Sequence, residues 1–247
     1  MTESEKEIGG APILHDGRYL SLTYDEKRLP KTAYPRRLAA YLTKSFLAPR
    51  GRLLDVGSGR GDFLEAFMGQ GLQVAGVDIS PAAPGLAPNH DVRVADLERE
   101  AMPFDKDSFD FAFSKSVLEH TRAPLKLLAE IKSTLKSGGV VIIMVPAWET
   151  GYKGSFYIDH THITPFTLPS LEDAMQLAGF ELVHSQLFWQ LPFVWRRPWL
   201  LPLLWVIRML PLPYRPMQKT NWPDSVNKII WFSKEAMLLC VGRKPVA

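Results

Sequence analysis

The fold follows from residues 51–61, Gly-Arg-Leu-Leu-Asp-Val-Gly-Ser-Gly-Arg-Gly, an apolar run that ends in alternating glycines. The run predicts a buried strand, and its glycines predict a loop in which backbone N–H groups can approach a ligand directly. A second apolar run, residues 73–78, ends at Asp78, whose carboxylate can accept the hydroxyls of a ribose. The ends of two strands are therefore expected to face one nucleotide-binding crevice.

The spacing of the glycines narrows the class of ligand. A dinucleotide fingerprint needs glycine where this chain has Asp62, so a hydride-transferring dehydrogenase is disfavoured. A Walker loop is excluded because no Gly-Lys-Ser/Thr follows. The loop, with Asp55 before it, instead resembles motif I of the class I S-adenosylmethionine-dependent methyltransferases, whose cofactor carries a carboxylate and a sulfonium in place of phosphates.

Further landmarks extend this resemblance to residues 34–185, in the small-molecule branch of the family (methyltransferase type 11-like). They are the ends of the second and third strands, a Val-Leu-Glu-His turn after the fourth, and a helix and glycine turn before the fifth. The resemblance implies that Asp78 binds the ribose hydroxyls, Ile79 and Leu97 contact the adenine, and Asp96 accepts its amino group. The implied cofactor-binding residues are Asp55, Gly57, Ser58, Gly59, Gly61, Asp78, Ile79, Asp96, Leu97 and Ser114.

The periodicity of the sequence independently predicts an α/β fold. Apolar runs of strand length alternate with amphipathic runs of helix length, which is typical of a sheet covered by helices on both faces. With the resemblance, we expect a Rossmann-like doubly wound, mostly parallel seven-stranded sheet. Residues 81–89 carry three prolines and predict at most one turn of helix between the second and third strands.

Composition limits the compartment and the partners. The net charge of +3 and the absence of a dense basic run argue against nucleic-acid binding. Residues 1–7 are polar and acidic, unlike a secretory signal, and the single Cys240 can form no intramolecular disulfide. We therefore expect a cytoplasmic protein, and the sequence leaves its oligomeric state open.

One segment, residues 188–225, differs in composition from the rest of the chain. No acidic residue occurs between residues 182 and 223, while Trp and Arg are frequent, and the apolar run from Pro198 to Pro211 is too short to cross a bilayer. The segment suits a lid over the acceptor pocket, a peripheral contact with the inner face of the membrane, or an oligomer interface. The expected organisation is an N-terminal extension (1–33), a methyltransferase domain (34–187 and 226–247) and this insertion.

The acceptor side of the site is expected in residues 157–166. Here His160 or His162, oriented by Asp159, is a candidate base for an acceptor hydroxyl, although both histidines also suit structural hydrogen bonding. We expect no metal, since the His-x-His pair with Asp159 has no identifiable fourth ligand. In the Val-Leu-Glu-His turn, Glu119 and His120 are interpreted as a helix-start charge and a local hydrogen-bonding group.

Together these observations predict an S-adenosylmethionine-dependent methyltransferase that acts on a small or lipid-linked acceptor, at oxygen. Methyl transfer from a sulfonium asks the protein mainly to position the acceptor, and a base only when the acceptor is protonated. The alternative is a non-catalytic scaffold that retains the cofactor fold and uses residues 188–225 to contact a membrane or a partner. The intact strand-end carboxylates argue against that alternative.

Overall fold

The computed structural model describes residue 20 and residues 30–152, 156–214 and 224–246. Most of the N-terminal extension expected at residues 1–33 therefore lies outside the described residues, as do residues 215–223 of the insertion. Among the described residues, no helix has both the length and the apolar character that a membrane-spanning segment needs.

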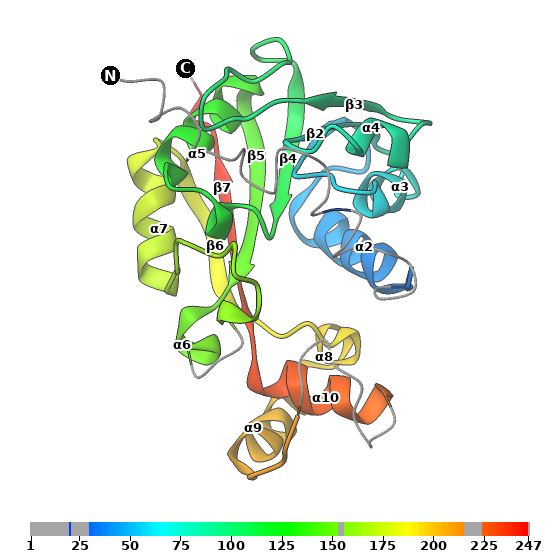
Figure 1. Cartoon of the computed structure of the whole chain (residues 1–247), viewed down its shortest axis with the longest axis vertical. Coiled ribbons are helices and arrows are strands. Elements are labelled where there is room, and N and C mark those ends of the chain that lie inside the picture. Colours follow the sequence, from blue (N-terminus) through cyan, green and yellow to red (C-terminus); the bar gives the residue numbers. More distant parts are fainter. Residues whose placement is uncertain (1–19, 21–29, 153–155, 215–223, 247) are drawn as a thin grey trace, which may run out of the picture.

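Seven strands form a single sheet in the order β3-β2-β1-β4-β5-β7-β6 (Figure 1). Neighbouring strands are parallel from β3 to β5, and β7 runs antiparallel to both β5 and β6. The expected seven-stranded Rossmann-like sheet is thus confirmed, and it is a mixed sheet because of β7. The strands are β1 (Arg52–Val56), β2 (Gln73–Asp78), β3 (Asp91–Val94), β4 (Phe109–Lys115), β5 (Leu135–Pro146), β6 (Glu181–Phe188) and β7 (Met237–Arg243).

Helices cover the sheet and extend from one end of it (Figure 1). The turn expected at residues 81–89 is the four-residue α4, because the prolines around it prevent a longer helix. The helical elements are α2 (Tyr34–Phe46), α3 (Asp62–Met68), α4 (Ala83–Leu86), η3 (Leu118–His120), α5 (Pro124–Thr134), α6 (Trp148–Gly151), η4 (Phe156–Ile158), α7 (Leu168–Leu177), α8 (Pro192–Arg196), η5 (Pro198–Leu200), α9 (Leu201–Met209) and α10 (Asp224–Lys234).

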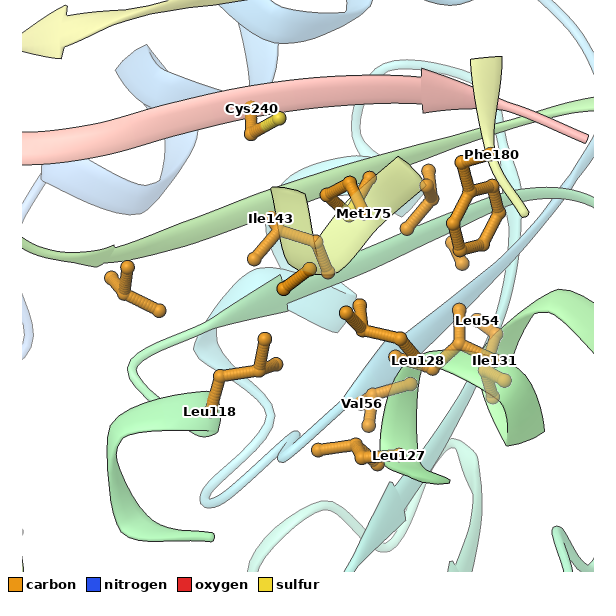
Figure 2. Packing of buried hydrophobic residues seen from close by; sticks show 14 of the residues in the cluster. Leu54, Val56, Leu118, Leu127, Leu128, Ile131, Ile143, Met175, Phe180 and Cys240 are labelled. Atoms are coloured by element: carbon orange, nitrogen blue, oxygen red, sulfur yellow. The ribbon is translucent and has the colours of Figure 1, made fainter. Parts of the chain in front are cut away.

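Alternate residues of the central strands face two hydrophobic cores. On one face, Leu54 and Ile143 pack with Leu128 and Ile131 of α5 and with Met175 of α7 (Figure 2). On the other face, residues such as Leu53, Phe113 and Ile142 pack against α2 and α3. Because side chains alternate along a strand, successive residues of each strand enter opposite cores. The residues at the strand ends lie beyond both cores and are available to form a site.

The segment after β6 builds a small cluster of its own. Leu191 and Val194 of the α8 region pack with Leu204 of α9 and with Phe232 of α10. Trp195 anchors this cluster to the domain, since its ring lies 5.0 Å from that of Phe188, and its indole N–H donates to the Trp189 carbonyl at 2.7 Å. In Figure 1, α8, α9 and α10 lie together at the end of the molecule where β7 begins.

Candidate functional site

The loop between β1 and α3 has the backbone that its glycines predict. Gly57, Gly59 and Gly61 have φ values of 81°, 53° and 80°, in the left-handed region that favours glycine. At Gly57 a Cβ atom would lie 2.2 Å from Cγ2 of Val117, so this loop and the turn after β4 approach more closely than any side chain allows. The Gly57 and Ser58 N–H groups donate to the Val77 carbonyl, which fixes the loop to the end of β2.

Asp78 is the carboxylate at the end of β2. Its two oxygens each accept a backbone hydrogen bond at 2.8 Å, from Gly59 N–H and from Ser80 N–H. Burial raises the pKa of Asp78, and these backbone donors act in the opposite direction. Because a carboxylate oxygen can accept more than one hydrogen bond, both oxygens retain capacity for the hydroxyls of a ligand.

A single pocket of about 650 Å³ connects these strand ends. Its wall includes seven of the residues predicted to bind the cofactor, together with residues of the turn after β4 and of the loop after η4. Gly61 caps α3, while Asp55 and Ser114 are buried in their strands; these three residues lie outside the lining. The seven lining residues are Gly57, Ser58, Gly59, Asp78, Ile79, Asp96 and Leu97.

Asp55 has a role different from that of Asp78. Its side chain is 2% exposed, and burial together with the nearby charge of Asp78 raises the pKa of Asp55 to about 8. A neutral Asp55 avoids placing two charges side by side in the interior. Only one of the two motif carboxylates, Asp78, thus lines the pocket.

Another part of the pocket wall is formed where residues 159–164 pack against the η3 turn. The Ile163 and Thr164 N–H groups donate to the Glu119 carbonyl at 2.8 and 3.0 Å, and the Thr164 hydroxyl donates to the Thr121 carbonyl at 2.6 Å. His160 and Thr161 line the pocket from this loop, and His120 lines it from the turn. His162 lies outside the pocket lining.

Two histidines in this region have defined tautomers. The Thr161 hydroxyl donates its single hydrogen to Asp159 at 2.6 Å, so the contact of 2.9 Å between its oxygen and His120 Nδ1 requires His120 to be the donor. His162 Nδ1 lies 2.6 Å from the Phe156 carbonyl, which can only accept. In both rings the Nε2 atom therefore carries the lone pair when the ring is neutral. Asp159, predicted to orient His160 or His162, is connected through Thr161 to His120.

Glu119 is the residue of this region that the sequence did not reveal as part of the site. It is fully buried, and neither carboxylate oxygen accepts a hydrogen bond of normal geometry among the described residues. Burial raises the pKa of Glu119 to about 8, and His162 Nε2 lies 4.0 Å from Oε1. Burial also lowers the pKa of His120, to about 4, and that of His162. The sequence feature that could have pointed to Glu119 is its position in the turn directly after a strand end, where site residues of this fold lie.

The structure thus shows a Rossmann-like fold with a pocket at the ends of β1 and β2, where the sequence predicts a nucleoside-containing cofactor. Comparison with known proteins makes the class specific. The methyltransferase-domain family matches residues 24–185. An uncharacterized methyltransferase of Mycobacterium tuberculosis is 35% identical over 153 residues, which cover 55% of this chain and 56% of the relative.

Other relatives and solved structures agree. An uncharacterized methyltransferase of Mycobacterium leprae is 38% identical over 108 residues, covering 40% of this chain and 39% of the relative. A SAM-dependent methyltransferase from Archaeoglobus fulgidus has the same fold, with a TM-score of 0.62 and 20% identity, over 90% of this chain and 99% of that one. The matches to the Mycobacterium proteins span about half of those proteins or less.

The chain belongs to the methyltransferase-domain family, and S-adenosylmethionine is its cofactor. The residues present fit that molecule. A Cβ atom on Gly59 would have only Leu20 Cδ2 within 4 Å, at 3.9 Å, so the backbone there is open to a ligand. Ser58 also lines the pocket, but its hydroxyl is buried against Gly76, where a Cβ atom would lie 2.7 Å from it. The open backbone of Gly59, whose N–H donates to Asp78, suits the close approach of a ligand to that carboxylate.

Proposed function

We propose that the protein transfers the methyl group of S-adenosylmethionine to a hydroxyl of a small or lipid-linked acceptor. One observation carries this proposal. The pocket that contains the cofactor-binding residues continues without interruption to Ser116, His120, His160 and Thr161. A cofactor held by Asp78 would therefore share one pocket with an acceptor held by the histidine loop.

Polar and aromatic groups at this end can position an acceptor and manage its proton. Bound S-adenosylmethionine supplies an electrophilic methyl group on a sulfonium. His160 lines the pocket and is exposed, so it is better placed than His162 to take the hydroxyl proton as the oxygen–carbon bond forms. Asp159 and Thr161 fix the orientation of His120 at the same wall. A hydroxyl acceptor uses this arrangement, whereas a neutral amine would not need it.

Residues 188–225 support the lipid-linked form of the acceptor. In α9 one side, including Leu204, packs on α8 and α10, while Trp205, Val206 and Met209 form a second apolar side that is 55%, 54% and 82% exposed. Trp199, just before this helix, is 72% exposed. An apolar surface of this kind, rich in Trp, suits the headgroup region of a bilayer.

Charge favours an anionic membrane as the partner of this surface. Arg37, Arg196 and Arg197 surround a small hollow beside the exposed Phe193. No acidic residue occurs between residues 182 and 223 to oppose them. Guanidinium groups at the edge of an apolar surface bind lipid phosphates while the apolar side chains enter the bilayer. We accordingly place the protein in the cytoplasm, at the inner face of the membrane.

Methyl transfer is tested by S-adenosylhomocysteine formation with hydrophobic alcohols and polyprenol-linked acceptors. We expect His160→Gln to lower the turnover and to leave the dissociation constant of S-adenosylhomocysteine unchanged. Undiminished turnover in this variant would remove His160 from the reaction. Cofactor binding with no turnover on any acceptor of these classes would favour the scaffold function.

Membrane contact is tested by sedimentation with vesicles of phosphatidylglycerol and of phosphatidylcholine. We expect the protein to sediment with the anionic vesicles, and the double variant Trp199→Ala/Trp205→Ala to lose most of that binding. Leu177→Ala on α7 removes an equally exposed apolar side chain elsewhere and is the matched control. Equal sedimentation of the double variant and this control would contradict the proposed surface.

A further inference from the structure

Three neighbouring side chains, of which His120 lines the pocket, have donor atoms close enough together to hold a metal ion. One donor atom from each of Glu119, His120 and His162 lies within 4.8 Å of the others. Two of these residues are adjacent in the η3 turn, and the third is held against the turn by the backbone hydrogen bonds of Ile163 and Thr164. We propose that Glu119, His120 and His162 bind a divalent transition-metal ion of the zinc class.

The buried carboxylate of Glu119 is the first argument for a cation. Glu119 is fully buried, and neither of its oxygens accepts a hydrogen bond of normal geometry among the described residues, so its lone pairs can be offered to an ion. Within the part of the chain that the structure describes, the only basic group that reaches 4.0 Å from this carboxylate is His162. A metal ion would occupy the lone pairs that the protein leaves without a donor.

The tautomers of the two histidines are the second argument. His120 directs its Nδ1 to Thr161, and His162 donates its Nδ1 N–H to the Phe156 carbonyl, so in each ring Nε2 is the nitrogen that a metal ion would bind. Histidines that bind metals usually donate their other ring N–H to a carbonyl or carboxylate in this way. The hydrogen bond from Thr161 to Asp159 extends the support of His120 to a carboxylate.

The donor set also indicates the kind of metal and its role. Two imidazoles and one carboxylate are the three protein ligands of several catalytic zinc sites, in which the fourth position takes water or substrate. His120 lines the pocket, so this position can open toward the acceptor. There a coordinated acceptor hydroxyl would lose its proton more easily, with His160 as the proton acceptor. This role rests on the proposed function, whereas the metal site itself does not.

This ligand set differs from the His-x-His and Asp159 set that the sequence suggests. The His-x-His pair with Asp159 lacks an identifiable fourth ligand, so the sequence alone predicts no metal. In the structure His162 pairs with Glu119 and His120, while Asp159 supports His120 through Thr161. The ligand set is completed by a turn some 40 residues earlier in the chain.

Metal binding by the full-length, tag-free protein tests the inference without an activity assay. The protein is stripped with EDTA and titrated with Co²⁺, followed by visible absorption, and with Zn²⁺ against a chromophoric chelator. We expect one equivalent of each metal to bind, with the intense cobalt bands of a four- or five-coordinate site. Glu119→Gln and His162→Gln should each weaken binding at least about 100-fold, since even groups behind the ligands contribute about 10–100-fold.

His90→Gln, which removes a histidine outside the cluster, is the matched control and should bind metal as the unchanged protein does. Titration of every variant with S-adenosylhomocysteine verifies that the fold is intact, because the cofactor residues are separate from the cluster. Failure of the unchanged protein to bind one equivalent, or wild-type affinity in Glu119→Gln, would overturn the metal site. Failure to bind S-adenosylhomocysteine would instead count against the proposed function.

Discussion

Replacement of Asp78 by alanine gives a quantitative test of the cofactor site. Asp78 offers two carboxylate oxygens at the end of β2, and each already accepts one backbone hydrogen bond. A hydrogen bond to a charged group contributes about 1.5–3 kcal/mol when its partner is otherwise left unpaired. Water replaces part of this loss at the mouth of the pocket, so a net loss of about 1.5–3 kcal/mol is expected for the two ribose hydroxyls together.

This loss corresponds to a dissociation constant for S-adenosylhomocysteine that rises about 10- to 100-fold. The effect on folding should be smaller, because two changes oppose each other. The N–H groups of Gly59 and Ser80 lose their acceptor, but a buried carboxylate close to Asp55 is also removed. The variant is therefore expected to be folded and to bind weakly.

Calorimetric titration with S-adenosylhomocysteine, together with thermal unfolding, separates these effects. Asp91→Ala removes a carboxylate from the exposed edge strand β3 and serves as the control. A dissociation constant for Asp78→Ala within about threefold of the control, a difference under 1 kcal/mol, would refute the assignment of Asp78 to the ribose.

Two further predictions concern the motif around β1. Gly57→Ala should lower the free energy of unfolding by about 2–5 kcal/mol in urea titrations, since its Cβ would lie 2.2 Å from Val117 in a backbone with φ of 81°. Gly59→Ala, which has open space at the Cβ, is the control and should lower it less. Equal losses in the two variants would contradict the predicted clash with Val117. Asp55→Asn should change the pH dependence of stability. With the pKa of Asp55 raised to about 8, the folded protein keeps a proton between pH 4 and 8 that the unfolded chain loses, so wild-type stability falls as pH rises through this window. The variant cannot titrate at this position, and its stability relative to wild type should therefore increase from pH 5 to 8; parallel profiles would show that Asp55 does not hold that proton.

Local sequence predicted the features that depend on neighbouring residues. The glycine loop, the strand ending at Asp78 and the short helix at residues 83–86 follow from backbone preferences and from the alternation of buried residues. Seven of the ten predicted cofactor residues share one pocket, because the carboxyl ends of parallel strands meet at one edge of a sheet.

The sequence did not predict which tryptophans after β6 are packed against the domain and which are exposed. In the sequence they form one group, but Trp195 packs on Phe188 and fixes α8 to the domain, while Trp199 and Trp205 are exposed. Whether an apolar side chain is anchored or exposed depends on which distant surface its helix meets. Such a surface is assembled from residues far apart in the chain. The composition of the segment therefore identified it as unusual but could not separate the packed tryptophans from the exposed ones.

The sequence by itself determined the α/β fold, the cofactor class and the strand-end carboxylates, because each follows from a short pattern. Only the tertiary structure decided the surroundings of Glu119. A glutamate at the start of a helical turn is usually solvated, and nothing local distinguishes it from one that is buried. Its burial and its proximity to His162 arise because the loop of residues 159–164 folds back onto the turn after β4, through hydrogen bonds between segments about 40 residues apart.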